Sequence, residues 1–131
     1  MNETTEINIE FPFDDGGSVS GFVSVTSLGN NLYRLEETPF AEYATFRDVI
    51  EVEKVGDSNF VFKRVAEKSQ YKCHEWVFSK SLVESEEFKK VLKRVGDEGG
   101  HWEIIFGGMV FIHLPIDSNL DITHEIQNMA A

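Results

Sequence analysis

The side chains best suited to metal binding or nucleophilic catalysis are a single cysteine, Cys73, and four histidines. Cys73 and His74 are neighbours in a segment with strand character, so their side chains should point to opposite faces of a sheet. Such a pair cannot easily share a tetrahedral metal ion or act as a nucleophile and its base. His101 and His113 belong to one expected hairpin but lie near opposite ends of it, and no acidic ligand obviously opposes them. We therefore predict no metal site and no cofactor.

Other catalytic motifs are absent or weak. No Gly-x-Ser-x-Gly sequence occurs, and neither Gly16-Gly17 nor Gly99-Gly100 continues into a phosphate-binding loop. The adjacent carboxylates Asp14-Asp15 and Glu36-Glu37 are typical of solvated surface rather than of an acid/base pair. The best polar cluster is 101–103, where His101 and Glu103 flank Trp102, although packing is the favoured role there. We predict no catalytic residue and a protein that is not an enzyme.

The composition predicts one folded domain over residues 1–131. The hydrophobic fraction of 41% is too high for a disordered chain. Twenty-three acidic and twelve basic residues give a net charge of −11, which disfavours binding to nucleic acid or to an anionic membrane. No apolar run reaches the roughly 20 residues of a membrane span, and residues 1–10 lack the pattern of a secretory signal. We expect a cytoplasmic monomer.

The charges are unevenly distributed along the chain. Residues 1–54 hold eleven acidic and three basic residues, residues 55–96 hold six and nine, and residues 97–131 hold six and none. If the two acidic ends meet in the fold, they form an anionic face whose partner would be basic. Acidity that serves only solubility is the open alternative.

The first half has the pattern of an antiparallel β meander. Turn-forming residues at 14–17, 29–31 and 56–58 separate segments that alternate between apolar and polar positions. The expected strands are 7–13, 22–28, 32–36, 48–55 and 59–66. Residues 5–66 are thus predicted to form a small open barrel or a strongly bent sheet.

The second half, residues 71–129, is predicted to be βαββα. After a strand at 71–78, apolar residues at helical spacing follow a capping-box pattern at Ser81 and Glu84, and Gly96 would end that helix. Gly107-Gly108 is typical of a two-residue hairpin, and a final helix would begin after Asp117 or Ser118. The chain is therefore predicted to be α+β, with a second half similar to a ferredoxin-like arrangement that lacks its opening strand.

Several short motifs resemble one bacterial family that is known as a domain of unknown function. Residues 32–40 match its Tyr-x-Leu strand and Pro-Phe corner, 48–52 its Asp-Val run, 99–103 its Gly-x-x-Trp-Glu element, and 113–115 its Pro-terminated strand. The resemblance spans residues 5–129. It implies an architecture and a bacterial origin, and it supplies no catalytic residues. The chain departs from the family by lacking a tryptophan before the Tyr-x-Leu strand and by having Arg47 where the family has glycine.

By type, the chain also resembles the small acidic immunity proteins that neutralise contact-delivered bacterial toxins. A nuclease toxin must be cationic to hold its substrate, so an anionic inhibitor would associate with it rapidly. We predict partner contacts through exposed carboxylates, with two aromatic residues as apolar anchors. The predicted contact residues are Asp14, Asp15, Glu36, Glu37, Phe40, Glu42, Tyr43, Asp117 and Asp121.

An alternative function is left open by the residues themselves. A small ligand-binding domain or an enzyme could use a cleft between the two halves, with His101 and Glu103 on its wall. For Phe40, the equally open alternative is that Pro39 and Phe40 together form a buried corner.

Overall fold

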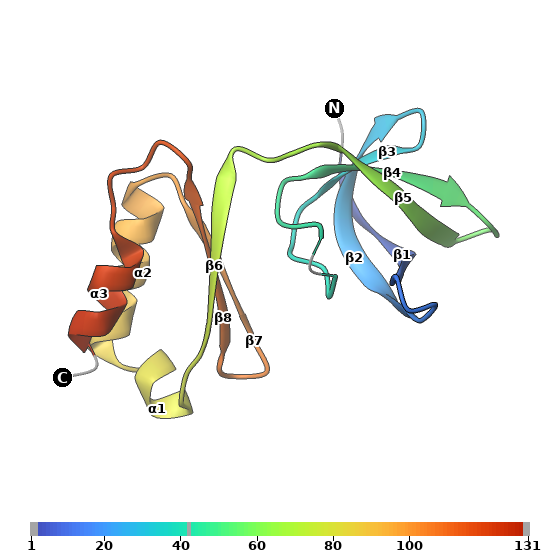
Figure 1. The fold of residues 1–131 in the computed structure, drawn as a ribbon. Helices are drawn as coiled ribbons and strands as arrows, with labels where there is room; N and C mark the ends of the chain where they lie inside the picture. The colour runs from blue at the N-terminus through green and yellow to red at the C-terminus, as the bar shows by residue number, and fades with distance from the viewer. Residues whose placement is uncertain (1–2, 42, 130–131) are drawn as a thin grey trace. The chain divides into compact units, whose positions relative to one another are not determined.

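The first five strands form a closed barrel in the computed structural model, which describes residues 3–41 and 43–129. The chain folds as two compact units, residues 1–69 and 70–131, and the architecture is α+β as predicted (Figure 1). The strands of the N-terminal unit are β1 (Thr4–Pro12), β2 (Ser18–Gly29), β3 (Leu32–Leu35), β4 (Val49–Lys54) and β5 (Asn59–Glu67).

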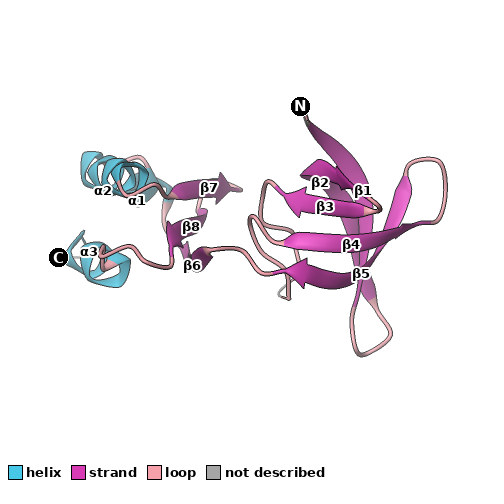
Figure 2. Cartoon of the chain, turned by 90° about the horizontal axis from the view of Figure 1, so that it is seen from above, coloured by secondary structure: helices cyan, strands magenta, loops and turns pink. Residues whose placement is uncertain are grey.

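Neighbouring strands of the barrel pair in chain order, and a parallel contact between β1 and β5 closes the ring (Figure 2). The four consecutive pairs are antiparallel, as the meander predicts. Asn8, Ile9 and Glu10 of β1 pair with 59–61 of β5. The barrel is therefore closed rather than open, because the two end strands bond to each other and no strand of this sheet keeps a free edge.

Apolar side chains at alternate strand positions fill the barrel. Ile9 and Phe11 of β1 and Val23 and Val25 of β2 are 5% exposed or less, as the period-two pattern predicts. The hairpin between β2 and β3 turns at Asn30 and Asn31, whose φ angles of 56° and 64° asparagine tolerates well.

One buried carboxylate holds the long connection between β3 and β4. Asp48 is 0% exposed, and its two oxygens accept hydrogen bonds from the backbone N–H groups of Thr45 at 2.9 Å and Ser69 at 2.8 Å. The Lys68 ammonium lies 3.3 Å from the same carboxylate. Just before it, Arg47 has a φ of 70°, which gives a physical reason for a glycine at this position.

The C-terminal unit places two helices on one face of a three-stranded sheet (Figure 1). Its elements are β6 (Tyr71–Val77), α1 (Lys80–Val83), α2 (Glu86–Asp97), β7 (His101–Ile105), β8 (Met109–Pro115) and α3 (Ile122–Met129). The strand order is β6-β8-β7, and β8 is antiparallel to both neighbours. This is the β1-β3-β2 part of a ferredoxin-like sheet, so the missing strand is the last one and the prediction of a missing opening strand is wrong.

The helix boundaries differ from the expected ones. Two helices replace the predicted single helix, and their N-caps are Ser79 and Ser85, whose hydroxyls each accept a backbone N–H bond at 3.2 Å. The capping box at Ser81 is therefore wrong. Gly96 lies inside α2, and Gly99, with a φ of 80°, follows its C-terminus. The last helix begins at Ile122, since the Asp121 carboxylate accepts the His124 N–H bond.

The β7–β8 hairpin also turns one residue earlier than Gly107-Gly108 predicts. Phe106 and Gly107 carry the positive φ angles, 56° and 79°. Gly108 has a different role: a Cβ there would lie 2.4 Å from the Phe78 carbonyl oxygen. The second glycine is thus required by close backbone approach rather than by the turn.

The buried apolar residues form two clusters, one in each unit, instead of the one continuous core that the length suggests. In the C-terminal unit, Phe88, Val91 and Val95 of α2 pack on Val110 and Ile112 of β8. The apolar stripe of α2 therefore packs against the apolar face of β8, on one side of the sheet. The prediction that both units act as one domain stays a prediction.

Candidate functional site

Glu36 and Glu37 have opposite surroundings, although they are adjacent. The Glu36 carboxylate is paired with Arg34 at 2.8 Å and Arg47 at 3.2 Å, and the Thr26 hydroxyl donates to it at 2.6 Å. Burial favours the neutral acid, but these hydrogen bonds and positive charges outweigh it and hold the pKa of Glu36 below its usual value. The Glu36 carboxylate is therefore occupied by contacts within the barrel unit.

Glu37 and Phe40 line a cavity of about 180 Å³ on the barrel. One oxygen of Glu37 accepts the Ser24 backbone N–H bond at 3.3 Å. The buried ring of Phe11 and the exposed ring of Phe22 also line this cavity. Only half of the Pro39-Phe40 corner is buried: Pro39 is buried, whereas Phe40 is 59% exposed.

Phe22 is a residue that the sequence reasoning missed. It is 68% exposed, because it occupies the outward phase of β2, directly before the inward Val23. An aromatic residue at a position where the alternation predicts a polar one is the signal that could have identified it.

Two glutamates of β1 lie beside Phe22 on the outside of the barrel. The register pairs Phe22 with Asn8, so Glu6 and Glu10 are its diagonal neighbours across the ladder. Both are exposed. We refer to Glu6, Glu10, Phe22, Glu37 and Phe40 together as the Phe22 surface.

Asp14, Asp15 and Tyr43 lie together beyond the end of β1. The Tyr43 hydroxyl donates to the Pro12 carbonyl oxygen at 2.8 Å. Burial, followed by the negative charge of Asp14, raises the pKa of Tyr43. Asp15 accepts the Gly17 N–H bond in the turn and is exposed, as is Asp14. Glu42 lies outside the described residues.

Ion pairing leaves the barrel unit with an excess of free negative charge. Five of its six basic side chains are paired with carboxylates; two of these, Arg34 and Arg47, share Glu36. Among the described residues, eight carboxylates of this unit have no ion-pair partner. They are Glu3, Glu6, Glu10, Asp14, Asp15, Glu37, Asp57 and Glu67.

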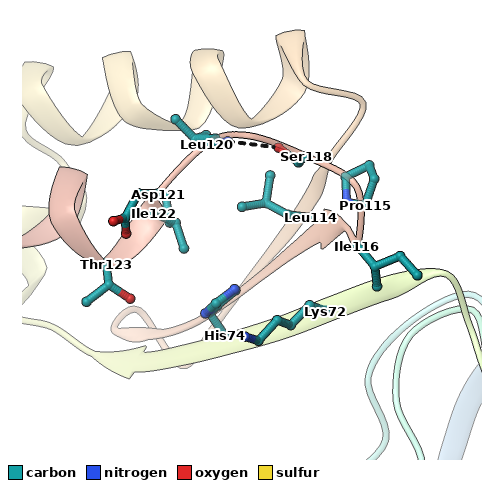
Figure 3. Close-up of a pocket in the computed structure, with 10 residues that line it drawn as sticks. All are labelled: Lys72, His74, Leu114, Pro115, Ile116, Ser118, Leu120, Asp121, Ile122 and Thr123. Carbon is teal, nitrogen blue, oxygen red and sulfur yellow. Dashed lines mark hydrogen bonds between the residues drawn. The ribbon is translucent and has the colours of Figure 1, made fainter.

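Asp117 and Asp121 belong to the C-terminal unit. Asp121 is at the edge of a second cavity, of about 300 Å³, and Asp117 is exposed nearby in the chain. Figure 3 shows Lys72 and His74 projecting from β6 on one side, with Asp121 and Thr123 across from them at the start of α3. Burial, helped by the charge of Lys72, holds the pKa of His74 below its usual value, although Asp121 opposes this shift.

The histidines of the β7–β8 hairpin oppose each other directly, contrary to expectation. His101 pairs with His113 in the register, because the start of one hairpin strand meets the end of the other. His113 is 0% exposed, and its Nε2 atom lies 2.6 Å from a carboxylate oxygen of Glu103. An acidic partner is therefore present, but a fully buried imidazole is closed to a substrate. In the described part of the chain, no three His, Cys, Asp or Glu residues are grouped to hold a metal ion.

The two adjacent residues Cys73 and His74 face apart, as expected. Cys73 stands opposite His113 in the sheet register, whereas His74 lines the cavity on the other face. Across the described ranges, no helix has both the length and the apolar content that a bilayer crossing requires.

No protein-family model matches this chain, and no curated protein matches it as a relative. It is similar to the crystal structure of a hypothetical protein from Neisseria gonorrhoeae, with a TM-score of 0.65 and 14% sequence identity. The match covers 97% of this chain and 86% of that one. The likeness shows the fold. At this identity it carries no function, and the resemblance to the bacterial family of unknown function stays a prediction.

Proposed function

We propose that this protein is a bacterial immunity-type protein that acts in the cytoplasm by binding and neutralising a cognate basic toxin. The Phe22 surface on the barrel is the proposed contact. The toxin would be a nuclease delivered by contact between cells, because a nuclease must carry positive charge to hold its substrate.

The observation that supports this proposal is the combination of exposed aromatic rings with unpaired carboxylates on one surface. Phe22 and Phe40 are 68% and 59% exposed, and Glu6, Glu10 and Glu37 lie around them without an ion-pair partner among the described residues. Aromatic residues are typical anchors of protein interfaces. Surrounding charges of one sign accelerate association with a partner of the other sign.

The test begins with isolation of the partner and ends with growth. Host lysate is passed at low salt over the immobilised protein and, in parallel, over the Phe22→Ala/Glu37→Gln double variant. A basic protein that is retained by the parent protein but not by the double variant is then expressed in cells, either alone or together with the parent protein. We expect the basic partner alone to arrest growth and co-expression of the parent protein to restore growth. Co-expression of the double variant should not restore it.

Two outcomes would contradict this function. Growth arrest that co-expression does not relieve would exclude neutralisation. Equal relief of growth arrest by the double variant would show that the Phe22 surface is not the contact. Phe106→Ala is the control, since it deletes another exposed phenylalanine (86%) from the C-terminal unit.

A second candidate function, small-ligand binding, is favoured by the 300 Å³ cavity of the C-terminal unit. Its volume is at the lower end of small-molecule sites, and Lys72 and His74 offer polar groups beside the apolar Leu114 and Ile122. A thermal-shift screen of small carboxylates and phosphates tests it. Stabilisation that Lys72→Ala abolishes and Lys90→Ala preserves would favour this function, and no stabilisation by either class would exclude it.

A further inference from the structure

We infer that the cavity between Phe22 and Phe40 is a receptor for one arginine side chain of the basic partner. This inference deepens the proposed function, since it names the chemical group that the Phe22 surface recognises. Both rings line the cavity and both remain largely exposed, at 68% and 59%. Both rings can therefore be reached by a group that enters from solvent.

The cavity is built for a cation rather than for a purely apolar group. The faces of aromatic rings attract positive charge, and Glu37 adds a carboxylate to the lining of the same cavity. Glu6 and Glu10, the diagonal neighbours of Phe22 across the strand ladder, add negative potential beside that ring. A neutral apolar side chain would use the rings but would leave these carboxylates without a counter-charge.

Arginine fits these features better than lysine does. The guanidinium group is planar, so it stacks on a ring and can still offer N–H donors in its own plane to a carboxylate. One Glu37 oxygen already accepts the Ser24 N–H bond at 3.3 Å, which fixes the orientation of the carboxylate. Lysine would supply a point charge that cannot stack and bridge at the same time.

The size of the cavity indicates a single side chain. Its volume of about 180 Å³ lies below the roughly 300–1,000 Å³ of most small-molecule sites. The lining includes Phe11, which is 2% exposed and packed against Tyr43 and Phe62, so the cavity adjoins the barrel core.

The test is an NMR titration of the full chain with Nα-acetyl-arginine methylamide, together with its citrulline and lysine counterparts. We expect saturable amide shifts at residues 21–23 and at 37, 38 and 40 with the arginine compound. Citrulline has nearly the same shape without the charge, so it should bind at least about fivefold more weakly. Lysine should fall between the two.

Variants separate the two interactions. Phe22→Leu keeps apolar bulk but removes the ring face, and we expect arginine binding to weaken about fivefold. Glu37→Gln should weaken it by a similar factor, whereas Phe106→Ala and Glu67→Gln should leave it unchanged. Equal binding of citrulline and arginine, shifts confined to other residues, or an unaltered affinity in Phe22→Leu would overturn the inference.

The two proposals can fail separately. Suppose that the arginine compound does not bind, whereas the toxin binds and Phe22→Ala abolishes this binding. The arginine receptor is then wrong and the proposed function stands. If the arginine compound binds as described but no basic partner is neutralised, the receptor stands and the immunity function is wrong.

Discussion

The barrel unit and the helix-covered sheet unit handle their charges in different ways. On α2, basic and acidic side chains pair along the helix surface, as Lys89 does with Glu86 and Lys93 with Asp97. On the barrel, five of the six basic side chains are paired, but thirteen acidic residues stand against these six in residues 1–69. Net charge alone therefore does not locate the proposed docking surface, and the proposal instead depends on where the carboxylates without an ion-pair partner lie.

Both units expose some aromatic rings, and in the C-terminal unit Phe106 is 86% exposed. Trp76 and Phe78 of the C-terminal unit pack against its core, and Phe88 is fully buried beneath them. The barrel keeps Phe22 and Phe40 at the surface, beside free carboxylates. Unpaired negative charge and exposed rings thus coincide on the barrel, and this combination supports the barrel as the proposed contact.

The largest expected effect is on stability and separates the two units. Asp48→Ala removes the carboxylate that accepts the part-buried Thr45 and Ser69 N–H bonds, so we expect about 3 kcal/mol of destabilisation of the barrel. Both tryptophans lie in the C-terminal unit, so fluorescence follows that unit, and amide NMR follows the barrel. In urea, the barrel amides should lose their native signals at lower denaturant than in the parent. Glu67→Ala is the exposed control, and an unchanged midpoint in Asp48→Ala would contradict the structural role of this carboxylate.

The next effect is on association and tests whether the location of charge matters. Glu6→Gln/Glu10→Gln/Glu37→Gln should lower the association rate constant with the basic partner about tenfold at low salt. Glu75→Gln/Glu84→Gln/Glu87→Gln removes equal charge from the C-terminal unit and should change the rate much less. Stopped-flow measurements at several salt concentrations give the comparison. Equal losses in both triple variants would show that total charge, rather than the Phe22 surface, steers the partner.

Two residues with positive φ give a smaller contrast. Phe106→Gly relieves a φ of 56° in an exposed hairpin, so it should stabilise the C-terminal unit by about 0.5–1 kcal/mol. Arg47→Gly relieves a φ of 70° but also removes the ion pair with Glu36, so the two effects should cancel to within about 1 kcal/mol. Urea midpoints measure both. A large loss in Arg47→Gly would mean that the ion pair outweighs the backbone strain.

The smallest effect is on the pH dependence of stability. The pKa of His74 is lowered on folding, so the unfolded chain takes up this proton first as the pH falls below the usual value of 6.5. The C-terminal unit should therefore lose part of its stability from about pH 6.5 down to the folded pKa. The pKa of Glu36 is also lowered, so its contribution is present above the usual value of 4.5 and is lost as the pH falls through its folded pKa.

These pH windows are measured by urea unfolding at several pH values, with tryptophan fluorescence for the C-terminal unit and amide NMR for the barrel. His74→Gln should remove the loss near pH 6.5, and Glu36→Gln should leave that window unchanged. A loss near pH 6.5 that persists in His74→Gln would assign it to another group.

Local patterns in the sequence were sufficient to predict most secondary structure. The strands that became β1, β3, β4 and β5 and the apolar stripe of α2 were expected near their observed positions, because a period of two or of 3.6 is a property of a short segment. The cap at Ser81 was misplaced because three serines, at 79, 81 and 85, offer similar capping chemistry within seven residues.

The candidate surface was predictable only in part. Glu37 and Phe40, which the sequence suggested as contacts, lie on the Phe22 surface, and Glu36 is instead paired with two arginines. Glu6, Glu10 and Phe22 were missed, because their proximity depends on the β1–β2 register. Whether these residues contact a partner stays a prediction.

The sequence by itself determined the α+β class, the order of the elements and the excess of negative charge, since all three follow from composition and short-range periodicity. Only the tertiary structure decided that β1 closes the barrel against β5, that His113 meets Glu103, and that Glu36 is ion-paired while Glu37 lines a cavity. The physical reason is the same in each case. A hydrogen bond or an ion pair depends on a distance of a few ångströms between residues far apart in the chain, and no local pattern encodes that distance.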